Sequence, residues 1–281
     1  MNSINSKINC KIVFICGASH SGSTLLGSIL GSHSKCFYAG ETNKTQFFGI
    51  EGEISVDKNC KICGPNCRIW SVYDSNSSVD LYEQLSRITG KQIIIDSNKN
   101  LGWFTKQINL MEKKNVKLYL IYLQRDGRAV INSIIRKYRE ISVENHINDW
   151  IKHIVFTNEL YQRFRGEKLK IHYEDLASKT DENVRKICEF LEINFEPEMV
   201  NYFYFEHHPL GGNTGTLSLI PKAQQKDNSS IIKLTNRNEY YYSKHPLNIK
   251  LDLRWKRELK SEYLQLFESL VGELNNDFRM D

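Results

Sequence analysis

A glycine-rich segment after a short apolar run constrains this chain more than any other feature. Residues 12–15 read Ile-Val-Phe-Ile, and residues 17–24 read Gly-Ala-Ser-His-Ser-Gly-Ser-Thr. A helix that follows would have one apolar face, formed by Leu25, Leu26, Ile29 and Leu30. A strand, a glycine-rich turn and a helix in this order direct backbone N–H groups and the positive helix end at an anion. The order predicts a phosphate-binding loop, and the alternative is a strand-to-helix turn without a ligand.

The loop lacks the lysine that a nucleotide triphosphatase needs. In the Walker pattern, the lysine after the second glycine reaches the outer phosphates, and the next hydroxyl holds Mg²⁺. Ser23 stands at the lysine position here, and Thr24 follows it. We therefore expect the loop to bind a phosphate without supporting transfer of a terminal phosphoryl group.

A second segment suits a second phosphate. The apolar run 118–123 leads into Arg125 and Asp126, and Ser133 follows near the start of a predicted helix. The planar fork of an arginine makes bidentate contacts to phosphate oxygens. Taken alone, an Arg-Asp pair at the end of a strand is more often a structural ion pair. Together with the first loop, they predict a ligand that carries two separate phosphates.

These segments resemble the sulfotransferases that use 3′-phosphoadenosine 5′-phosphosulfate (PAPS). Residues 21–24 match the family's loop for the 5′-phosphosulfate, and Arg125 and Ser133 match its 3′-phosphate residues. The Arg-Asp-Gly-Arg-Ala string at 125–129 looks most like the tyrosylprotein sulfotransferases and their bacterial relatives. Further similarity lies at residues 39–42, 95–99, 173–176 and 212–213.

The resemblance implies PAPS as co-substrate and in-line transfer of a sulfuryl group to a hydroxyl or amine acceptor. No metal is required for this reaction, because cationic side chains can neutralise the charge that develops. The cofactor-binding residues that it implies are Ser19, His20, Ser21, Gly22, Ser23, Thr24, Leu25, Arg125, Ser133, Tyr173, Gly212 and Asn213. A P-loop kinase and a non-catalytic nucleotide-binding protein remain the alternatives.

Three residues are candidates for the catalytic steps. Glu41 resembles the glutamate of the Gly-Glu motif in tyrosylprotein sulfotransferases and is our candidate base. The alternatives are a solvated carboxylate or one that positions the substrate. Lys99 matches a lysine that helps to stabilise the transferring sulfuryl in the relatives, and otherwise it is an exposed lysine without a role. His20 departs from the family, because relatives have lysine or arginine there. A histidine can donate a hydrogen bond or a proton to the departing phosphate.

Seven cysteines, an odd number, argue against an oxidised secreted scaffold. Cys10, Cys16, Cys36 and Cys188 lie in or beside apolar stretches, so we expect buried thiols. Cys60, Cys63 and Cys67 are spaced like three ligands of a zinc site, but the sequence offers only distant Cys36 or His33 as a fourth. Reduced loop cysteines, a metal site or a disulfide therefore all stay open, and we assign no metal. His207 and His208 are expected to shape the mouth of the cofactor or substrate site.

Short apolar runs predict an α/β fold, a P-loop-like three-layer sandwich with a central, mainly parallel sheet. The runs are 12–15, 93–95, 118–123 and 169–173, and three of them lead into polar strings, as parallel strands do when ligands lie beyond their carboxyl ends. Helical spacing is visible at 147–154 and 184–191, and a last helix is expected at about 253–275.

The 281 residues, 40% of them hydrophobic, fit a single sulfotransferase domain. We expect a cysteine-containing insertion at about 42–90 and a polar, mobile segment at about 207–250. The modest net charge of +5 fits an anionic cofactor better than nucleic acid. Without a long apolar stretch or a signal peptide, we expect a cytoplasmic protein with no membrane span. The acceptor is a small molecule, carbohydrate, lipid or peptide, and neither its identity nor the oligomeric state is readable.

Overall fold

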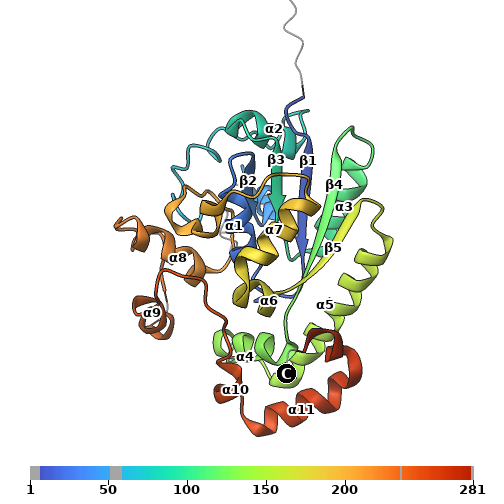
Figure 1. Ribbon diagram of the computed structural model, residues 1–281, viewed down its shortest axis with the longest axis vertical. Coiled ribbons are helices and arrows are strands. Elements are labelled where there is room, and N and C mark those ends of the chain that lie inside the picture. The colour runs from blue at the N-terminus through green and yellow to red at the C-terminus, as the bar shows by residue number, and fades with distance from the viewer. Residues whose placement is uncertain (1–6, 51–58, 235, 280–281) are drawn as a thin grey trace, which may run out of the picture. The chain divides into compact units, whose positions relative to one another are not determined.

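The computed structural model describes residues 7–50, 59–234 and 236–279 (Figure 1). Five strands form one sheet, in the order β2 (Cys36–Gly40), β3 (Ile93–Asp96), β1 (Lys11–Cys16), β4 (Lys117–Gln124) and β5 (Glu167–His172). Strand β3 pairs in parallel with both β1 and β2. The sheet is flanked by helices, and the predicted P-loop-like α/β fold is confirmed.

The buried strands explain why the apolar runs predicted them. Every residue of β3 is buried, and β1 and β4 are buried apart from their first residues. A strand that is covered on both faces reads as a continuous apolar run, without the alternation of a half-exposed strand. The strands predicted at 12–15, 93–95, 118–123 and 169–173 correspond to β1, β3, β4 and β5.

Strand β2 was not predicted. Its five residues, Cys-Phe-Tyr-Ala-Gly, are all buried, but two of them are small and carry little strand preference. The pairing that makes them a strand is long-range, since Cys36 lies opposite Ile93 and Gly40 opposite Asp96. The buried thiols expected at Cys16, Cys36 and Cys188 are confirmed, whereas Cys10 is exposed at the entry to β1.

Contacts divide the chain into two compact units. Of the described residues, the first unit comprises 7–15, 24–50, 59–119, 196–234 and 236–248, and the second comprises 16–23, 120–195 and 249–279. The single domain, the insertion and the mobile segment of the sequence analysis stay predictions.

The first unit holds β2, β3, most of β1, and five α-helices and three 3₁₀ helices of the described chain. Asp80, Asn100 and Asn213 accept backbone N–H groups at the first turns of three helices and so fix where these begin. The α-helices are α1 (Ser23–Gly31, whose first residue belongs to the second unit), α2 (Leu81–Thr89), α3 (Leu101–Met111), α8 (Thr214–Ala223) and α9 (Asn236–Ser243). The 3₁₀ helix η1 (Thr42–Phe47) follows β2. Two further short 3₁₀ helices are η2 (Pro197–Val200) and η3 (Tyr202–Tyr204).

The second unit holds the end of β4, strand β5 and the remaining helices. These helices are α4 (Gly127–Lys137), α5 (Val143–Arg163), α6 (Tyr173–Ser178), α7 (Thr180–Phe190), α10 (Trp255–Glu258), α11 (Ser261–Val271) and the 3₁₀ helix η4 (Gly272–Phe278). Helices α10 and α11 pack against α4 and α5 (Figure 1).

The single helix expected at 253–275 is wrong. The backbone is extended at Leu259 and Lys260, so α10 ends and α11 begins there. Each short helix buries an aromatic side chain, Trp255 in α10 and Phe267 in α11. Leu270, in the last turn of α11, is exposed.

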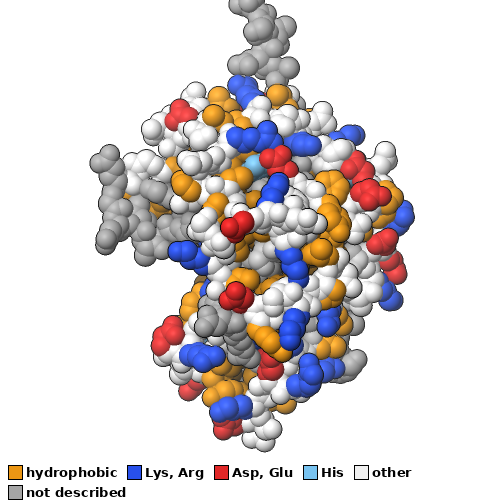
Figure 2. Space-filling view, turned by 90° about the vertical axis from the view of Figure 1, so that its left-hand side faces the viewer, with side chains coloured by type: hydrophobic (Ala, Val, Ile, Leu, Met, Phe, Trp, Pro, Cys, Tyr) orange, Lys and Arg blue, Asp and Glu red, His pale blue; other side chains and the backbone are white. Residues whose placement is uncertain are grey.

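Charged side chains of both signs are interspersed over the face in Figure 2, as the modest net charge suggests. Among the described residues, no helix is long and apolar enough to cross a membrane.

Candidate functional site

The glycine-rich loop lies between the end of β1 and the start of α1. Gly22 has φ +96°, and a Cβ there would lie 2.5 Å from the Tyr173 ring, so glycine is required. His20 also has a positive φ, +64°, which histidine tolerates better than most residues. The predicted loop therefore exists, and Tyr173 from α6 covers its second glycine.

Two buried polar atoms beside the loop carry no hydrogen bond from the described protein. They are the hydroxyl oxygen of Ser21, a fully buried residue, and Nε of Arg125, a residue that is 7% exposed. A buried polar atom without a partner costs about 1–3 kcal/mol, so such atoms are expected where a ligand binds. These features fit a bound phosphate.

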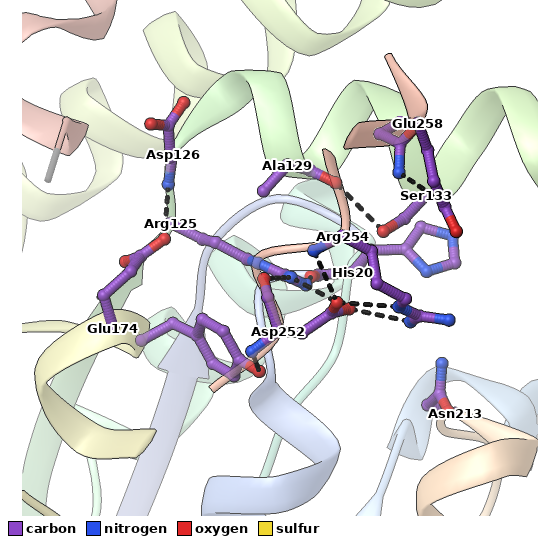
Figure 3. A network of polar contacts seen from close by, with 12 residues as sticks. His20, Arg125, Asp126, Ala129, Ser133, Glu174, Asn213, Asp252, Arg254 and Glu258 are labelled. Carbon is purple, nitrogen blue, oxygen red and sulfur yellow. Dashed lines mark hydrogen bonds and ion pairs between the residues drawn. The ribbon is translucent and has the colours of Figure 1, made fainter. Parts of the chain in front are cut away.

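Arg125 is held at the end of β4 by its neighbours, as Figure 3 shows. One guanidinium nitrogen donates to the His20 carbonyl over 2.7 Å, and the other donates to the Asp252 backbone over 3.3 Å. The guanidinium also stacks on Tyr173, 4.2 Å from the ring centre. The structure thus brings together four of the predicted cofactor residues: His20, Gly22, Arg125 and Tyr173.

Asp252 and Arg254, which were not predicted as site residues, complete this network (Figure 3). Two nitrogens of Arg254 donate to the Asp252 carboxylate, each over 2.7 Å. Asp252 lies 3.4 Å from Arg125 as well. Burial opposes ionisation of Asp252, but the hydrogen bonds from Arg254 and the charge of Arg125 outweigh it and hold its pKa well below the usual range. Nothing in the polar string around Asp252 marks it as a partner of Arg125.

Ser133 lies on α4, and its hydroxyl donates to the Ala129 carbonyl over 2.9 Å (Figure 3). To donate to a phosphate, the hydroxyl proton would have to rotate away from the Ala129 carbonyl. Asp126 caps the start of α4 by accepting from the Arg128 N–H over 2.9 Å. Arg128 in turn binds the Asp126 carboxylate and stacks on Trp255. Asp126 and Arg128 therefore hold the helix that presents Ser133.

In the first unit, Glu41 follows β2 and faces the Gly211-Gly212 turn. The Gly212 N–H donates to the Glu41 carboxylate over 3.2 Å, and the Lys44 ammonium lies 3.7 Å from it. A Cβ at Gly211, whose φ is +69°, would lie 2.5 Å from a Glu41 oxygen. The glycine at 211 therefore makes room for the Glu41 carboxylate.

Thr24, Gly212 and Asn213 also lie together in the first unit. The Asn213 N–H donates to the Thr24 hydroxyl over 2.8 Å, and the Asn213 side chain caps α8 through the Thr216 N–H over 2.9 Å. Thr24 is buried, and Leu25, next to it on α1, is half-buried. Ser19 lies exposed in the loop, whereas Ser23 is buried at the start of α1.

Lys99 follows β3, the strand beside β2. Since Gly40 pairs with Asp96, Glu41 and Lys99 leave neighbouring parallel strands at the same edge of the sheet. The Lys99 ammonium nitrogen is buried, unlike that of the exposed lysine in the alternative interpretation, and its role in catalysis stays a prediction.

Asp96 organises this edge and was not predicted as a site residue. It is fully buried and accepts from the Thr42 hydroxyl and from the Tyr82 hydroxyl, the latter over 3.0 Å. Trp103 donates to the same Thr42 oxygen over 2.9 Å. Because Thr42 follows Glu41 directly, these bonds fix the backbone that carries the candidate base.

Ionisation of Asp96 should lower the stability of the fold as pH rises from 3.8 through about 6. Burial raises the pKa of Asp96 to about 6 from 3.8, although hydrogen bonds from Thr42 and Tyr82 oppose the rise. The folded pKa lies above the unfolded one, so the stabilisation is full below pH 3.8 and is lost as pH rises through about 6. In urea unfolding across this range, Asp96→Asn should remove that loss. The same pH dependence in both proteins would contradict this assignment.

The three loop cysteines do have a fourth partner nearby, contrary to the sequence analysis. It is His208, not Cys36 or His33, and the four ligand atoms all lie within 4.8 Å of one another. His207 is fully buried, and Nε2 lies 2.8 Å from the Tyr202 carbonyl. Burial lowers the pKa of His207 to about 4. The two histidines are therefore engaged within the protein, and their place at the mouth of a site stays a prediction.

A family model described as the sulfotransferase family matches residues 13–197, more than half of the chain. The chain belongs to the sulfotransferase family. This sulfotransferase is 23% identical, over 211 residues, to a Caenorhabditis briggsae protein whose name assigns it provisionally to the protein-tyrosine sulfotransferases. The match covers 72% of this chain and 71% of the relative.

Solved sulfotransferase structures share the fold. The sulfotransferase domain of the curacin biosynthetic pathway has a TM-score of 0.55 at 18% identity, covering 94% of this chain and 98% of that domain. A mouse sulfotransferase complexed with PAP has a TM-score of 0.52 at 14% identity, covering 98% and 90%. The sulfotransferase domain of the Synechococcus PCC 7002 olefin synthase also has a TM-score of 0.52, at 18% identity, covering 95% and 96%.

Proposed function

We propose that this sulfotransferase takes its sulfuryl group from PAPS and transfers it in line to a hydroxyl or amine acceptor without a catalytic metal. One observation carries the proposal: among the described residues, neither the buried Ser21 hydroxyl of the loop nor Nε of Arg125 beside it has a hydrogen-bond partner, and Ser23 stands at the lysine position of a kinase. Such a loop is suited to hold a phosphate that is not itself transferred.

Each phosphate of the co-substrate would have its own residues. We assign the 5′-phosphosulfate to Ser19, Ser21, Gly22 and Ser23 of the loop and to Thr24 and Leu25 of α1. Arg125 and Ser133 are assigned to the 3′-phosphate. Arg125 supplies a permanent positive charge for the 3′-phosphate. Asp252 binds its guanidinium, and Arg254 binds Asp252. Tyr173, Gly212 and Asn213 are assigned to the remaining nucleotide contacts.

Three side chains are assigned to the transfer itself. The bond between sulfur and the bridging phosphate oxygen breaks while a bond forms to the acceptor atom, and the acceptor proton passes to Glu41. Lys99 neutralises charge on the sulfuryl oxygens, and His20 donates to the departing phosphate. Adenosine 3′,5′-bisphosphate (PAP) then leaves.

The role of His20 predicts a change in the pH profile. An arginine keeps its charge at every working pH, whereas a histidine cation is lost as pH rises. Turnover of His20→Arg relative to the unchanged enzyme should therefore increase steadily toward alkaline pH. Steady-state rates across a pH series test this, with PAP affinity measured at each pH as a control for loop integrity. Parallel profiles for both enzymes would show that His20 does not assist the leaving group as a cation.

Binding measurements distinguish this reaction from that of a phosphate-loop kinase. Calorimetry should show binding of PAP without added metal and much weaker binding of ATP with Mg²⁺. Preferred binding of ATP with Mg²⁺, or transfer that depends on Mg²⁺, would contradict the proposed co-substrate.

The acceptor is proposed only by class: a small molecule, carbohydrate, lipid or peptide with a nucleophilic hydroxyl or amine. The name of the Caenorhabditis briggsae relative makes tyrosyl peptides the first class to try. A panel of such acceptors with radiolabelled donor would identify the class. The cytoplasmic location also stays a proposal.

A further inference from the structure

We propose that Cys60, Cys63, Cys67 and His208 bind a structural zinc ion. Their ligand atoms all lie within 4.8 Å of one another, and three of the four residues are buried. Zinc bound to sulfur at about 2.3 Å in a tetrahedron places its ligand atoms about 3.8 Å apart, so little rearrangement is needed. Thiolate and imidazole ligands favour zinc over the oxygen-seeking cations Mg²⁺ and Ca²⁺.

His208 is oriented as a metal ligand. Its Nδ1 lies 3.2 Å from the Cys63 sulfur and 3.3 Å from the Cys67 sulfur. Its other nitrogen, Nε2, lies 3.0 Å from the Glu206 carboxylate, which Arg68 also binds over 2.7 Å. A metal-binding histidine commonly donates its second N–H to a carboxylate, which fixes the ring and the tautomer. Glu206 is therefore a positioning residue for His208.

The backbone around the cysteines is arranged for a thiolate cluster. The Cys63 N–H is directed at the Cys60 sulfur over 3.4 Å, and the Gly64 N–H closes the turn on the Cys60 carbonyl over 2.9 Å. Trp70 donates to the His208 carbonyl over 2.6 Å and so holds the histidine backbone against the cysteine loop. With four protein ligands the site has no open position, which is the pattern of a structural zinc ion and not a catalytic one.

The ion would fasten the cysteine loop to the segment that positions Glu41. Lys61 donates to the Pro209 carbonyl over 3.0 Å, and Leu210 donates to the Ala39 carbonyl over 2.9 Å. Gly212, two residues farther along, donates to the Glu41 carboxylate. Zinc bound to the three cysteines and His208 would thus stabilise the Gly211-Gly212 turn that contacts Glu41. The metal proposal itself does not depend on the role of Glu41.

Metal content of the full chain tests the proposal directly. Protein purified under reducing conditions without a metal-affinity step should contain about one zinc per chain by elemental analysis. Titration with a mercurial should release that zinc as the thiols react. Replacement by Co²⁺ should give the visible absorption bands of a tetrahedral cobalt–thiolate site. Cys10→Ser replaces an exposed cysteine outside the cluster, so it should leave the zinc content, the release of zinc and the cobalt absorption bands unchanged.

Variants of the cluster give a graded result. Cys63→Ser should abolish stoichiometric zinc, and Glu206→Gln should weaken zinc affinity about tenfold or more while the ligands stay in place. If Cys63→Ser does not fold, the zinc content and the cobalt spectrum of the unchanged protein still decide. Protein without zinc that binds no Co²⁺, or a disulfide among the three cysteines in mass spectra of the native protein, would overturn the proposal.

Discussion

Glu41→Gln should lower turnover about a hundredfold or more while leaving the affinity for PAP unchanged. A glutamine keeps the shape and the contact with the Gly212 N–H, but it cannot accept the acceptor proton. General bases contribute about 10²–10⁴-fold to rates, which sets the expected size. Steady-state kinetics with saturating PAPS measures turnover, and calorimetry with PAP measures the affinity.

The control is Glu198→Gln, which removes an exposed carboxylate of the first unit and should keep full activity. A Glu41→Gln enzyme with normal turnover and a higher KM for the acceptor would mean that Glu41 holds the acceptor. Buried His207, engaged with the Tyr202 carbonyl, is poorly placed to take over as base.

Arg125→Ala should weaken PAP binding about thirtyfold or more, equivalent to about 2 kcal/mol. It should barely change the affinity for adenosine 5′-phosphosulfate, which has no 3′-phosphate. The reason is that Arg125 is a mostly buried cation whose Nε has no hydrogen-bond partner among the described residues. Calorimetry on both ligands makes the comparison.

The matched control is Arg165→Ala, which removes an exposed arginine of the same unit and should change neither affinity. Arg125→Ala also removes the ion pair between Arg125 and Asp252. Thermal unfolding of the variant should therefore be measured to detect any loss of stability. Equal losses for both ligands would show that Arg125 acts on the fold or on the 5′ side, and would contradict its assignment.

Local patterns allowed much of the fold to be predicted. The loop at 17–24, four of the five strands and the helices at 147–154 and 184–191 each have a signal within a few neighbouring residues. Strand β2 has no such signal, because its pairing with β3 joins residues that lie more than 50 positions apart. The break between α10 and α11 was also missed, and each of the two helices has its own buried aromatic side chain, Trp255 or Phe267.

Some residues of the candidate site were likewise predictable from local patterns, and others were not. Ser21, Gly22 and Arg125 stand in strings that are recognisable in the sequence, and the structure gives each of them a matching environment. Asp252 and His208 are recognised only through partners that lie 127 and 141 residues away, Arg125 and Cys67. A single sequence contains no information on such distances, so the carboxylate behind Arg125 and the fourth ligand of the cysteine cluster had to come from the fold.

Transfer from radiolabelled PAPS is the most direct test of the reaction proposed here. The enzyme is incubated with the labelled donor and a panel of hydroxyl and amine acceptors, without added Mg²⁺, and the labelled acceptor and PAP are quantified together. We predict equal amounts of labelled acceptor and PAP with at least one acceptor class, and about a hundredfold less of both with Glu41→Gln. Tight binding of PAP without transfer to any acceptor, or phosphoryl transfer from ATP under the same conditions, would contradict it.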